Sequence, residues 1–274
     1  MTWIQSIILG IIQGITEFLP VSSSAHLVIF PYLLGWDIPA NQAFVFDVFV
    51  QVATLFAVIA FFWKDLSSIF ISLLKGVLQR KPFDDPLSRL GWLLILATLP
   101  AGFAGLLLKN LVEKTFASPL ISAMLLIVTG LMLLVAERIG KRNRSISVLK
   151  WNDAVTIGLF QAVAIFPGIS RSGACITGGM TRNLKRPDSA RLAFLMSVPI
   201  MLAAGLLASL DLSKIPNVSE WLISALPGFI ASAIVGYFSI RWLLHYLITK
   251  SFYIFSIYCF CLAALVFIVR VIRY

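Results

Sequence analysis

The sequence is poor in charge: Asp, Glu, Lys and Arg make up only 12% of its 274 residues, whereas soluble domains average about 25%. It is 59% apolar, and several apolar runs reach the length of about 20 residues that a membrane-spanning helix needs. These properties exclude a soluble enzyme, and the high hydrophobicity excludes intrinsic disorder. We therefore predict an all-α polytopic membrane protein.

Cysteine is also scarce, and basic residues are missing from the first part of the chain. Cys175, Cys259 and Cys261 lie in apolar stretches and form neither a zinc spacing nor a disulfide framework. No Lys or Arg precedes Lys64, so the start lacks the basic region of a signal peptide, and we expect it to be retained. The later basic residues fall between apolar runs, a distribution that does not indicate a nucleic-acid partner.

Six stretches are long and apolar enough to span a bilayer: 43–63, 88–108, 116–135, 190–210, 220–243 and 252–272. Two others, 2–35 and 150–181, begin apolar, break at a cluster of Pro, Gly and Ser, and then resume. We predict that these two are re-entrant hairpins of broken helices. Where a helix breaks at membrane depth, its backbone N–H and C=O groups lose their helical partners and must be buried in protein or line a water-filled cavity. Two such breaks at matching places in the chain therefore indicate a binding site.

The two broken segments match each other at an offset of 148 residues. Gly10 and Gln13 correspond to Gly158 and Gln161, and the order of apolar run, Gln, Phe, break and serine cluster is shared. We interpret this as an internal repeat, with halves 1–145 and 146–274. Three spans separate the hairpins, so the second hairpin enters from the opposite face, and the inverted repeat brings the two breaks together near the midplane.

Basic residues give an independent prediction of orientation. The segments 64–89, 138–150, 182–191 and 241–250 fall on one side and carry 16 Lys and Arg residues. The other side carries only five: Lys109, Lys114, Lys214, Arg270 and Arg273. The positive-inside rule places the first side in the cytoplasm and both termini outside. The segment Leu66–Leu78 is expected along the cytoplasmic interface.

The first break combines an acid, hydroxyls and an imidazole. Gln13 and Glu17 are four residues apart and share a helix face. Pro20 suits the first turn of a new half-helix, and Ser22 or Ser23 is suited to cap that helix. The free N–H groups at the start of the helix attract an anion. Ser23 and His26 are three apart, which predicts a hydroxyl beside an imidazole on one face.

The second break places a guanidinium among hydroxyls and flexible backbone. Arg171 lies between Ser170 and Ser172, three residues after Gly168. The guanidinium fork fits phosphate, and hydroxyls and N–H groups complete such a cradle. The two breaks together therefore predict an intramembrane site for an anion, typically a phosphate ester.

Other interpretations remain open at this point. In one of these interpretations, Glu17 and Arg171 form an ion pair that only holds the two repeats together. Asp47 and Gln51, four apart in the first full span, are expected to support helix packing or the site rather than react. From the residues alone, a hydrolytic enzyme and the alternative, a transporter or flippase of an anionic lipid or small anion, are equally well supported.

The two motifs resemble those of the bacterial undecaprenyl-diphosphate phosphatase family, known also for bacitracin resistance. The first break is similar to an acidic motif that runs into a serine-rich turn and a His, and the second to Pro-Gly-x-Ser-Arg-Ser. The matching positions are Gln13, Glu17, Ser22, Ser23, His26, Pro167, Gly168, Ser170, Arg171 and Ser172. The chain departs from the family pattern at Gln13, where many members carry Glu, and at Ala25 and Cys175.

The resemblance covers essentially the whole chain. It implies removal of one phosphate from a C55 polyprenyl diphosphate, which yields the monophosphate carrier lipid of cell-wall synthesis. It also implies a homodimer in the bacterial inner membrane with a site open to the outer face. A divalent cation, Mg²⁺ or Ca²⁺, is expected on Glu17 with help from Gln13.

On this basis Ser23 is expected to be the nucleophile with His26 as its base, while His26 itself or water are the alternatives. Arg171 is expected to stabilise the transferred phosphoryl group. The remaining phosphate-binding candidates are Ser22, Gly168, Ser170 and Ser172, and the residues expected to support the site are Asp47, Gln51, Gln161 and Thr177.

Overall fold

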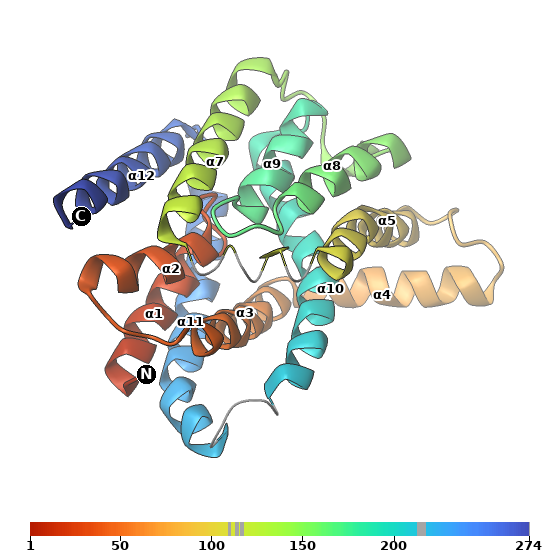
Figure 1. Ribbon diagram of the computed structural model, residues 1–274. Coiled ribbons are helices and arrows are strands. Elements are labelled where there is room, and N and C mark those ends of the chain that lie inside the picture. Colours follow the sequence, from red (N-terminus) through yellow and green to blue (C-terminus); the bar gives the residue numbers. More distant parts are fainter. Residues whose placement is uncertain (109–110, 113–114, 116–117, 213–217, 274) are drawn as a thin grey trace.

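The computed structural model describes residues 1–108, 111–112, 115, 118–212 and 218–273 (Figure 1). Within these ranges the chain is helical and has no strand. The helices are α1 (Trp3–Thr16), α2 (Ser23–Leu34), α3 (Ala40–Phe61), α4 (Trp63–Leu78), α5 (Pro86–Leu107), α7 (Pro119–Ile139), α8 (Trp151–Val163), α9 (Arg171–Thr181), α10 (Arg186–Leu212), α11 (Val218–Tyr246) and α12 (Tyr253–Arg273), with a 3₁₀ turn at Ile146–Val148. The prediction of an all-α membrane protein is confirmed.

Six of these helices are long and apolar enough to cross a membrane. Their candidate spans are Gln42–Phe61, Pro86–Leu107, Pro119–Ile139, Arg186–Leu207, Val218–Tyr246 and Tyr253–Arg273. Each coincides with a span predicted from the sequence to within a few residues. The remaining long helix, α4, packs against α5 and covers the segment predicted at the interface. Of the charges used to predict orientation, Lys109, Lys114 and Lys214 lie outside the described residues.

Both broken segments form two helices with an interruption between them. Residues 17–22 separate α1 from α2, and residues 164–170 separate α8 from α9. Pro20 lies inside the first interruption, and α2 begins only at Ser23, so Pro20 does not occupy the first helical turn that the sequence suggested. The path of these segments relative to the bilayer, and the division of the chain at residue 145, stay predictions.

Each broken segment packs against a full helix from the other half of the chain. α1 runs along α11, and α8 runs along α5. Glycines 148 residues apart make both close approaches possible: a Cβ on Gly10 would lie 2.1 Å from the carbonyl oxygen of Gly228, and one on Gly158 would lie 2.6 Å from that of Ala97. Such distances leave no room for a side chain. Figure 1 shows α1 and α2 on one side of the molecule and α8 and α9 on the other.

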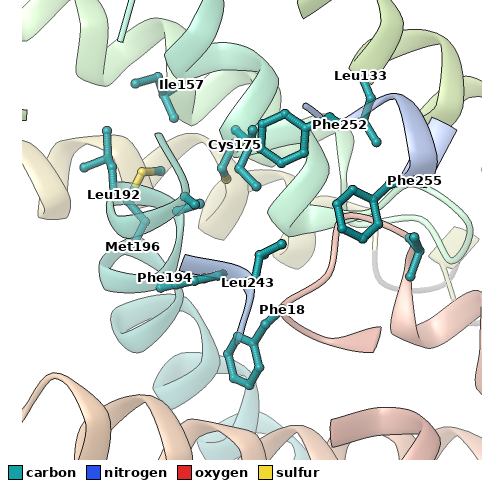
Figure 2. Close-up of a cluster of buried hydrophobic side chains, with 14 of the residues drawn as sticks. Phe18, Leu133, Ile157, Cys175, Leu192, Phe194, Met196, Leu243, Phe252 and Phe255 are labelled. Atoms are coloured by element: carbon teal, nitrogen blue, oxygen red, sulfur yellow. The ribbon is translucent and has the colours of Figure 1, made fainter. Parts of the chain in front are cut away.

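The main core surrounds the two interruptions. Phe18, from the first interruption, meets Phe194 of α10 edge to face at 5.4 Å between ring centroids. Figure 2 shows this pair near Leu243, with Cys175 in the same cluster. These buried side chains fix the position of the polar residues beside them.

Buried acids join the basic loops to the helix ends. The Asp153 carboxylate, at the start of α8, accepts hydrogen bonds from Arg144 and Arg182. Burial alone would raise the pKa of Asp153, but the hydrogen bonds from both arginines and from the backbone N–H of Lys150, together with the charge of Arg144, outweigh burial and lower that pKa to about 2. Glu137 is paired in the same way with Arg142 and Arg186. Because a buried charge left unpaired is costly, these contacts hold the loops in place.

Candidate active site

The two interruptions contact each other directly. The backbone N–H of Gly168 donates to Ser22 Oγ at 3.1 Å, and Ser172 Oγ donates to the carbonyl of Leu19 at 3.1 Å. Arg171 forms an ion pair with Glu17. The predicted meeting of the two breaks is therefore present in the structure, across about 150 residues of sequence.

Glu17 is the centre of this contact. One carboxylate oxygen accepts from Arg171, and the other accepts from Gln13 Nε2 at 2.7 Å and from Ser23 Oγ at 2.5 Å. Gln13, Glu17 and Ser23 are all buried. A hydroxyl is thus hydrogen-bonded to a carboxylate that a guanidinium keeps in place, which is the arrangement of a nucleophile and its base.

Serines cap both half-helices. Ser22 precedes α2, and its hydroxyl accepts from the N–H of Ala25 at 3.4 Å. Ser170 precedes α9 and accepts from the N–H of Gly173 at 3.0 Å. Ser22 has φ +66°, a conformation that costs a residue other than glycine about 1–3 kcal/mol and that clusters at functional sites. The first turns of both helices point partial positive charge at the shared site.

Thr129 of α7 supports the second interruption, and sequence reasoning missed it. Its hydroxyl donates to the carbonyl of Gly168 at 2.8 Å and accepts from the N–H of Ser170 at 2.9 Å. The only sign of this role in the sequence is that Thr129 is a polar residue within an apolar span. Its partners are about 40 residues away, so spacing did not reveal them.

The structure does not bring His26 to Ser23, which corrects the expected pairing. His26 Nδ1 lies 2.7 Å from the carbonyl oxygen of Ser22, and Nε2 lies 2.7 Å from the hydroxyl of Tyr258 on α12. The ring stacks between Phe30 and Tyr258. Both nitrogens are therefore occupied, and Ser23 is bonded to Glu17 instead.

The cavity at the meeting point has a volume of about 600 Å³. Its polar end is formed by Glu17, Ser22, Ser23, Ser24, Asp47, Gln51, Gln161, Ser170 and Arg171. Its other walls are mainly apolar. Most of their residues belong to α5 and α10: Ala101, Gly102, Gly105, Leu106, Ile200, Met201, Ala203, Ala204, Leu206 and Leu207. The rest include Phe44 and Val48 of α3 and Ala164, Ile165 and Ile169 of the second interruption. A site of this kind accepts a ligand with an anionic head and an apolar tail.

The residues expected to support the site divide into two groups. Asp47 and Gln51 line the cavity, and Gln51 Nε2 donates to Asp47 Oδ2 at 2.6 Å, which leaves the buried Oδ1 without a partner. Gln161 also reaches the cavity and donates to the carbonyl of Ala97. Thr177 is buried, does not line the cavity, and has no partner for its hydroxyl. Asp47 is therefore closer to the site than the sequence suggested.

The fold and the site define an integral membrane protein with a cavity at the meeting point of two broken helical segments, where a guanidinium and several hydroxyls lie together. The family model described as bacitracin resistance protein BacA matches residues 6–265. This chain belongs to that family.

Relatives in several bacteria match along nearly the whole chain. The present chain is 39% identical to a protein named undecaprenyl-diphosphatase from Thermomicrobium roseum. The match extends over 272 residues and covers 97% of each chain. The protein of the same name from Chloroherpeton thalassium is 41% identical and covers 94% of this chain and 93% of its own. That from Caldicellulosiruptor bescii is 41% identical over 274 residues, 100% of this chain and 99% of its own.

Proposed function

We propose that this protein hydrolyses undecaprenyl diphosphate to undecaprenyl phosphate and inorganic phosphate, and so supplies the carrier lipid of cell-wall synthesis and confers bacitracin resistance. One observation carries the proposal: a single cavity has Ser23, Glu17 and Arg171 at one end and apolar walls from α5 and α10 along the rest. The names of the relatives agree with it. Transport of an anionic lipid requires no hydroxyl bonded to a carboxylate, and no relative cited here is named as a transporter.

The contacts of Ser23 indicate the chemical step. Its oxygen attacks the terminal phosphorus, its proton passes to Glu17 Oε2 across the 2.5 Å hydrogen bond, and the bond to the bridging oxygen breaks. The lipid monophosphate leaves with the proton that Glu17 received, and a phosphoserine remains. Glu17, ionised again, then takes a proton from a water molecule whose oxygen attacks the phosphoserine. Inorganic phosphate is released as the bond to the Ser23 oxygen breaks, and the proton on Glu17 returns to Ser23. Glu17 thus takes the role of base that the sequence suggested for His26.

Charge stabilisation comes from Arg171 and the two helix starts. A guanidinium has five N–H donors, and the bond to Glu17 leaves others for phosphate oxygens. Arg171 and Ser170 line the cavity, and the hydroxyl of Ser170 lies 3.1 Å from that of Ser172. These donors are held in place before substrate binds, as electrostatic stabilisation of a transition state requires.

The same cavity fits a divalent cation. Within the described ranges no three His, Cys, Asp or Glu residues converge, but Mg²⁺ usually takes only one or two carboxylates plus substrate phosphates. Among the described residues, the buried oxygens Gln13 Oε1 and Asp47 Oδ1 have no hydrogen-bond partner. Asp47 Oδ1 belongs to a residue on the cavity wall, whereas Gln13 Oε1 belongs to a residue that does not line the cavity but donates to Glu17. Glu17, Gln13 and Asp47 would hold the cation, which would supply positive charge to the diphosphate.

The apolar walls suit the tail of the lipid. At Gly102 and Gly105 of α5, no atom of the part of the chain that the structure describes lies within 4 Å of the position of a Cβ, so the cavity has room beside them. Ala203 and Ala204 of α10 line the same cavity. We propose that the first isoprene units lie between α5 and α10, and that the rest of the tail extends into the bilayer.

The proposed setting is the bacterial inner membrane, with both termini outside, the site open to the outer face, and a homodimer as the working form. The excess of basic residues in the loops 64–89, 138–150 and 182–191 supports the orientation. Labelling of single cysteines from outside intact cells checks the orientation, and crosslinking in native membranes checks the dimer.

The function is tested by quenching the purified protein during turnover of undecaprenyl diphosphate labelled in its terminal phosphate. We expect undecaprenyl phosphate and inorganic phosphate in equal amounts, with labelled phosphoserine at position 23 that is lost in Ser23→Ala. Label on His26, or turnover by Ser23→Ala at the wild-type rate, would contradict the proposed step. Absence of any phosphate release would remove the proposed function.

A further inference from the structure

We propose that His26 and Tyr258 are positioning residues, which hold the turn that presents Ser23 to Glu17. The effects that we expect on kcat and KM rest on the proposed function. The hydrogen bonds that hold His26 do not depend on it. The inference gives a purpose to a buried imidazole and a partly exposed phenol that the chemical step does not use.

The hydrogen bonds of His26 define which nitrogen carries its proton. A carbonyl oxygen only accepts, so Nδ1, 2.7 Å from the carbonyl of Ser22, must be the N–H donor. In the neutral ring Nε2 is then the acceptor, and the hydroxyl of Tyr258 donates to it at 2.7 Å. The nitrogen able to take a proton is thus occupied by Tyr258.

The position of the ring also separates His26 from the chemistry. His26 is only 1% exposed and is not among the residues that line the cavity, whereas Ser22, Ser23 and Ser24 are. Its ring planes lie within 3° of Tyr258 and 23° of Phe30, with centroids 5.6 and 5.9 Å away. Two aromatic rings and two hydrogen bonds leave the imidazole one orientation.

The residue that His26 holds is the strained one. Ser22 has φ +66°, outside the range that most residues adopt. The imidazole of His26 donates to the carbonyl of Ser22 and so fixes its direction. The hydroxyl of Ser22 accepts a hydrogen bond from the N–H of Gly168, in the second interruption, at 3.1 Å. The next residue, Ser23, then reaches Glu17. The chain of contacts therefore runs from Tyr258 on α12 through His26 and Ser22 to both interruptions.

The substitution His26→Asn distinguishes a positioning role of His26 from a role as general base. The amide nitrogen of Asn stands where Nδ1 stands in His, so His26→Asn keeps a donor for the carbonyl of Ser22 but cannot take up a proton. His26→Ala loses both. Misplacement of a reacting group by about 1 Å costs on the order of 100-fold, whereas loss of a general base costs about 10²- to 10⁴-fold.

The experiment compares kcat and KM for phosphate release by the full-length protein in lipid nanodiscs. We expect His26→Ala to lose about 100-fold in kcat with little change in KM, and His26→Asn to recover at least about tenfold of that loss. Tyr258→Phe, which keeps the ring, should lose about threefold to tenfold, the value of one hydrogen bond. An Asn variant as inactive as Ala, while equally well folded, would overturn the proposal.

A second measurement does not depend on activity. The chain has only two histidines, so ¹⁵N-histidine labelling with His245→Gln as the assignment variant isolates the signal of His26. We expect the neutral tautomer protonated on Nδ1, and a change in the Nε2 resonance in Tyr258→Phe. A tautomer protonated on Nε2 would overturn the proposal even if the enzyme is active. An inactive wild type with the Nδ1 tautomer would instead remove the proposed function alone.

Discussion

Glu17 joins the two interruptions at the site, because its two oxygens accept hydrogen bonds from Arg171, Gln13 and Ser23. A carboxylate in that position holds a guanidinium, orients an amide and takes a proton from a hydroxyl. At the scale of single residues, the proposed reaction therefore depends on the carboxylate of Glu17.

Glu17→Gln should lower kcat by about 10²- to 10⁴-fold, since an amide keeps the hydrogen bond to Ser23 but cannot accept its proton. The measurement is steady-state phosphate release. The matched control is Gln13→Glu, which restores the carboxylate that many family members carry. We expect that control to remain active. A Glu17→Gln variant with more than about a tenth of the wild-type kcat would show that the base lies elsewhere.

The sequence predicted most of the residues of the site but not all of their contacts. The spacing of Gln13, Glu17 and Ser23 placed them near one another because they are neighbours along the chain. The pairing of Ser23 with His26 was wrong, because helical spacing gives a shared face and not the partner of each atom. Tyr258 is 232 residues from His26, so the contact that decides the orientation of the imidazole had no local signal.

Two pairs of helices set the distance between the interruptions, α1 with α11 and α8 with α5. The equivalent glycines Gly10 and Gly158 lie where these helices touch. The sequence predicted the six spans because apolar length is a local property. It did not predict which helices pair, because that depends on contacts between distant small residues. At the scale of elements, the glycines are thus the determinants of the site geometry.

Gly158→Ala should destabilise the protein by about 1–3 kcal/mol, because the added carbon meets the carbonyl oxygen of Ala97 at 2.6 Å. Gly105→Ala is the matched control, since nothing lies within 4 Å of its Cβ. It should be neutral or gain up to about 1 kcal/mol from helix propensity. The midpoint of thermal unfolding in detergent measures both. Equal midpoints for the two variants would contradict the assigned packing.

The whole molecule joins a polar end to an apolar cavity within one helical bundle. Because the apolar walls come mainly from α5 and α10, the proposed function assigns the lipid tail and the phosphates to different parts of the chain. Affinity for the tail and reactivity of the head should therefore respond to different substitutions.

Gly102→Leu should raise KM for undecaprenyl diphosphate by about tenfold, since the side chain enters the apolar part of the cavity. Release of phosphate from a diphosphate with a short prenyl chain should change little. Leu99→Phe is the control, because Leu99 is exposed and does not line the cavity. If both substrates lose activity equally in Gly102→Leu, the tail does not lie between α5 and α10.

The most direct test of the central claim is the rate of phosphate release from undecaprenyl diphosphate by wild-type protein and by Arg171→Ala, prepared in the same nanodiscs. Arg171 is the guanidinium on the cavity wall beside Glu17, so its removal should lower the rate by about 10³-fold or more while the protein stays folded. Near-normal release by folded Arg171→Ala would contradict the assignment of the phosphate to the meeting point of the two interruptions.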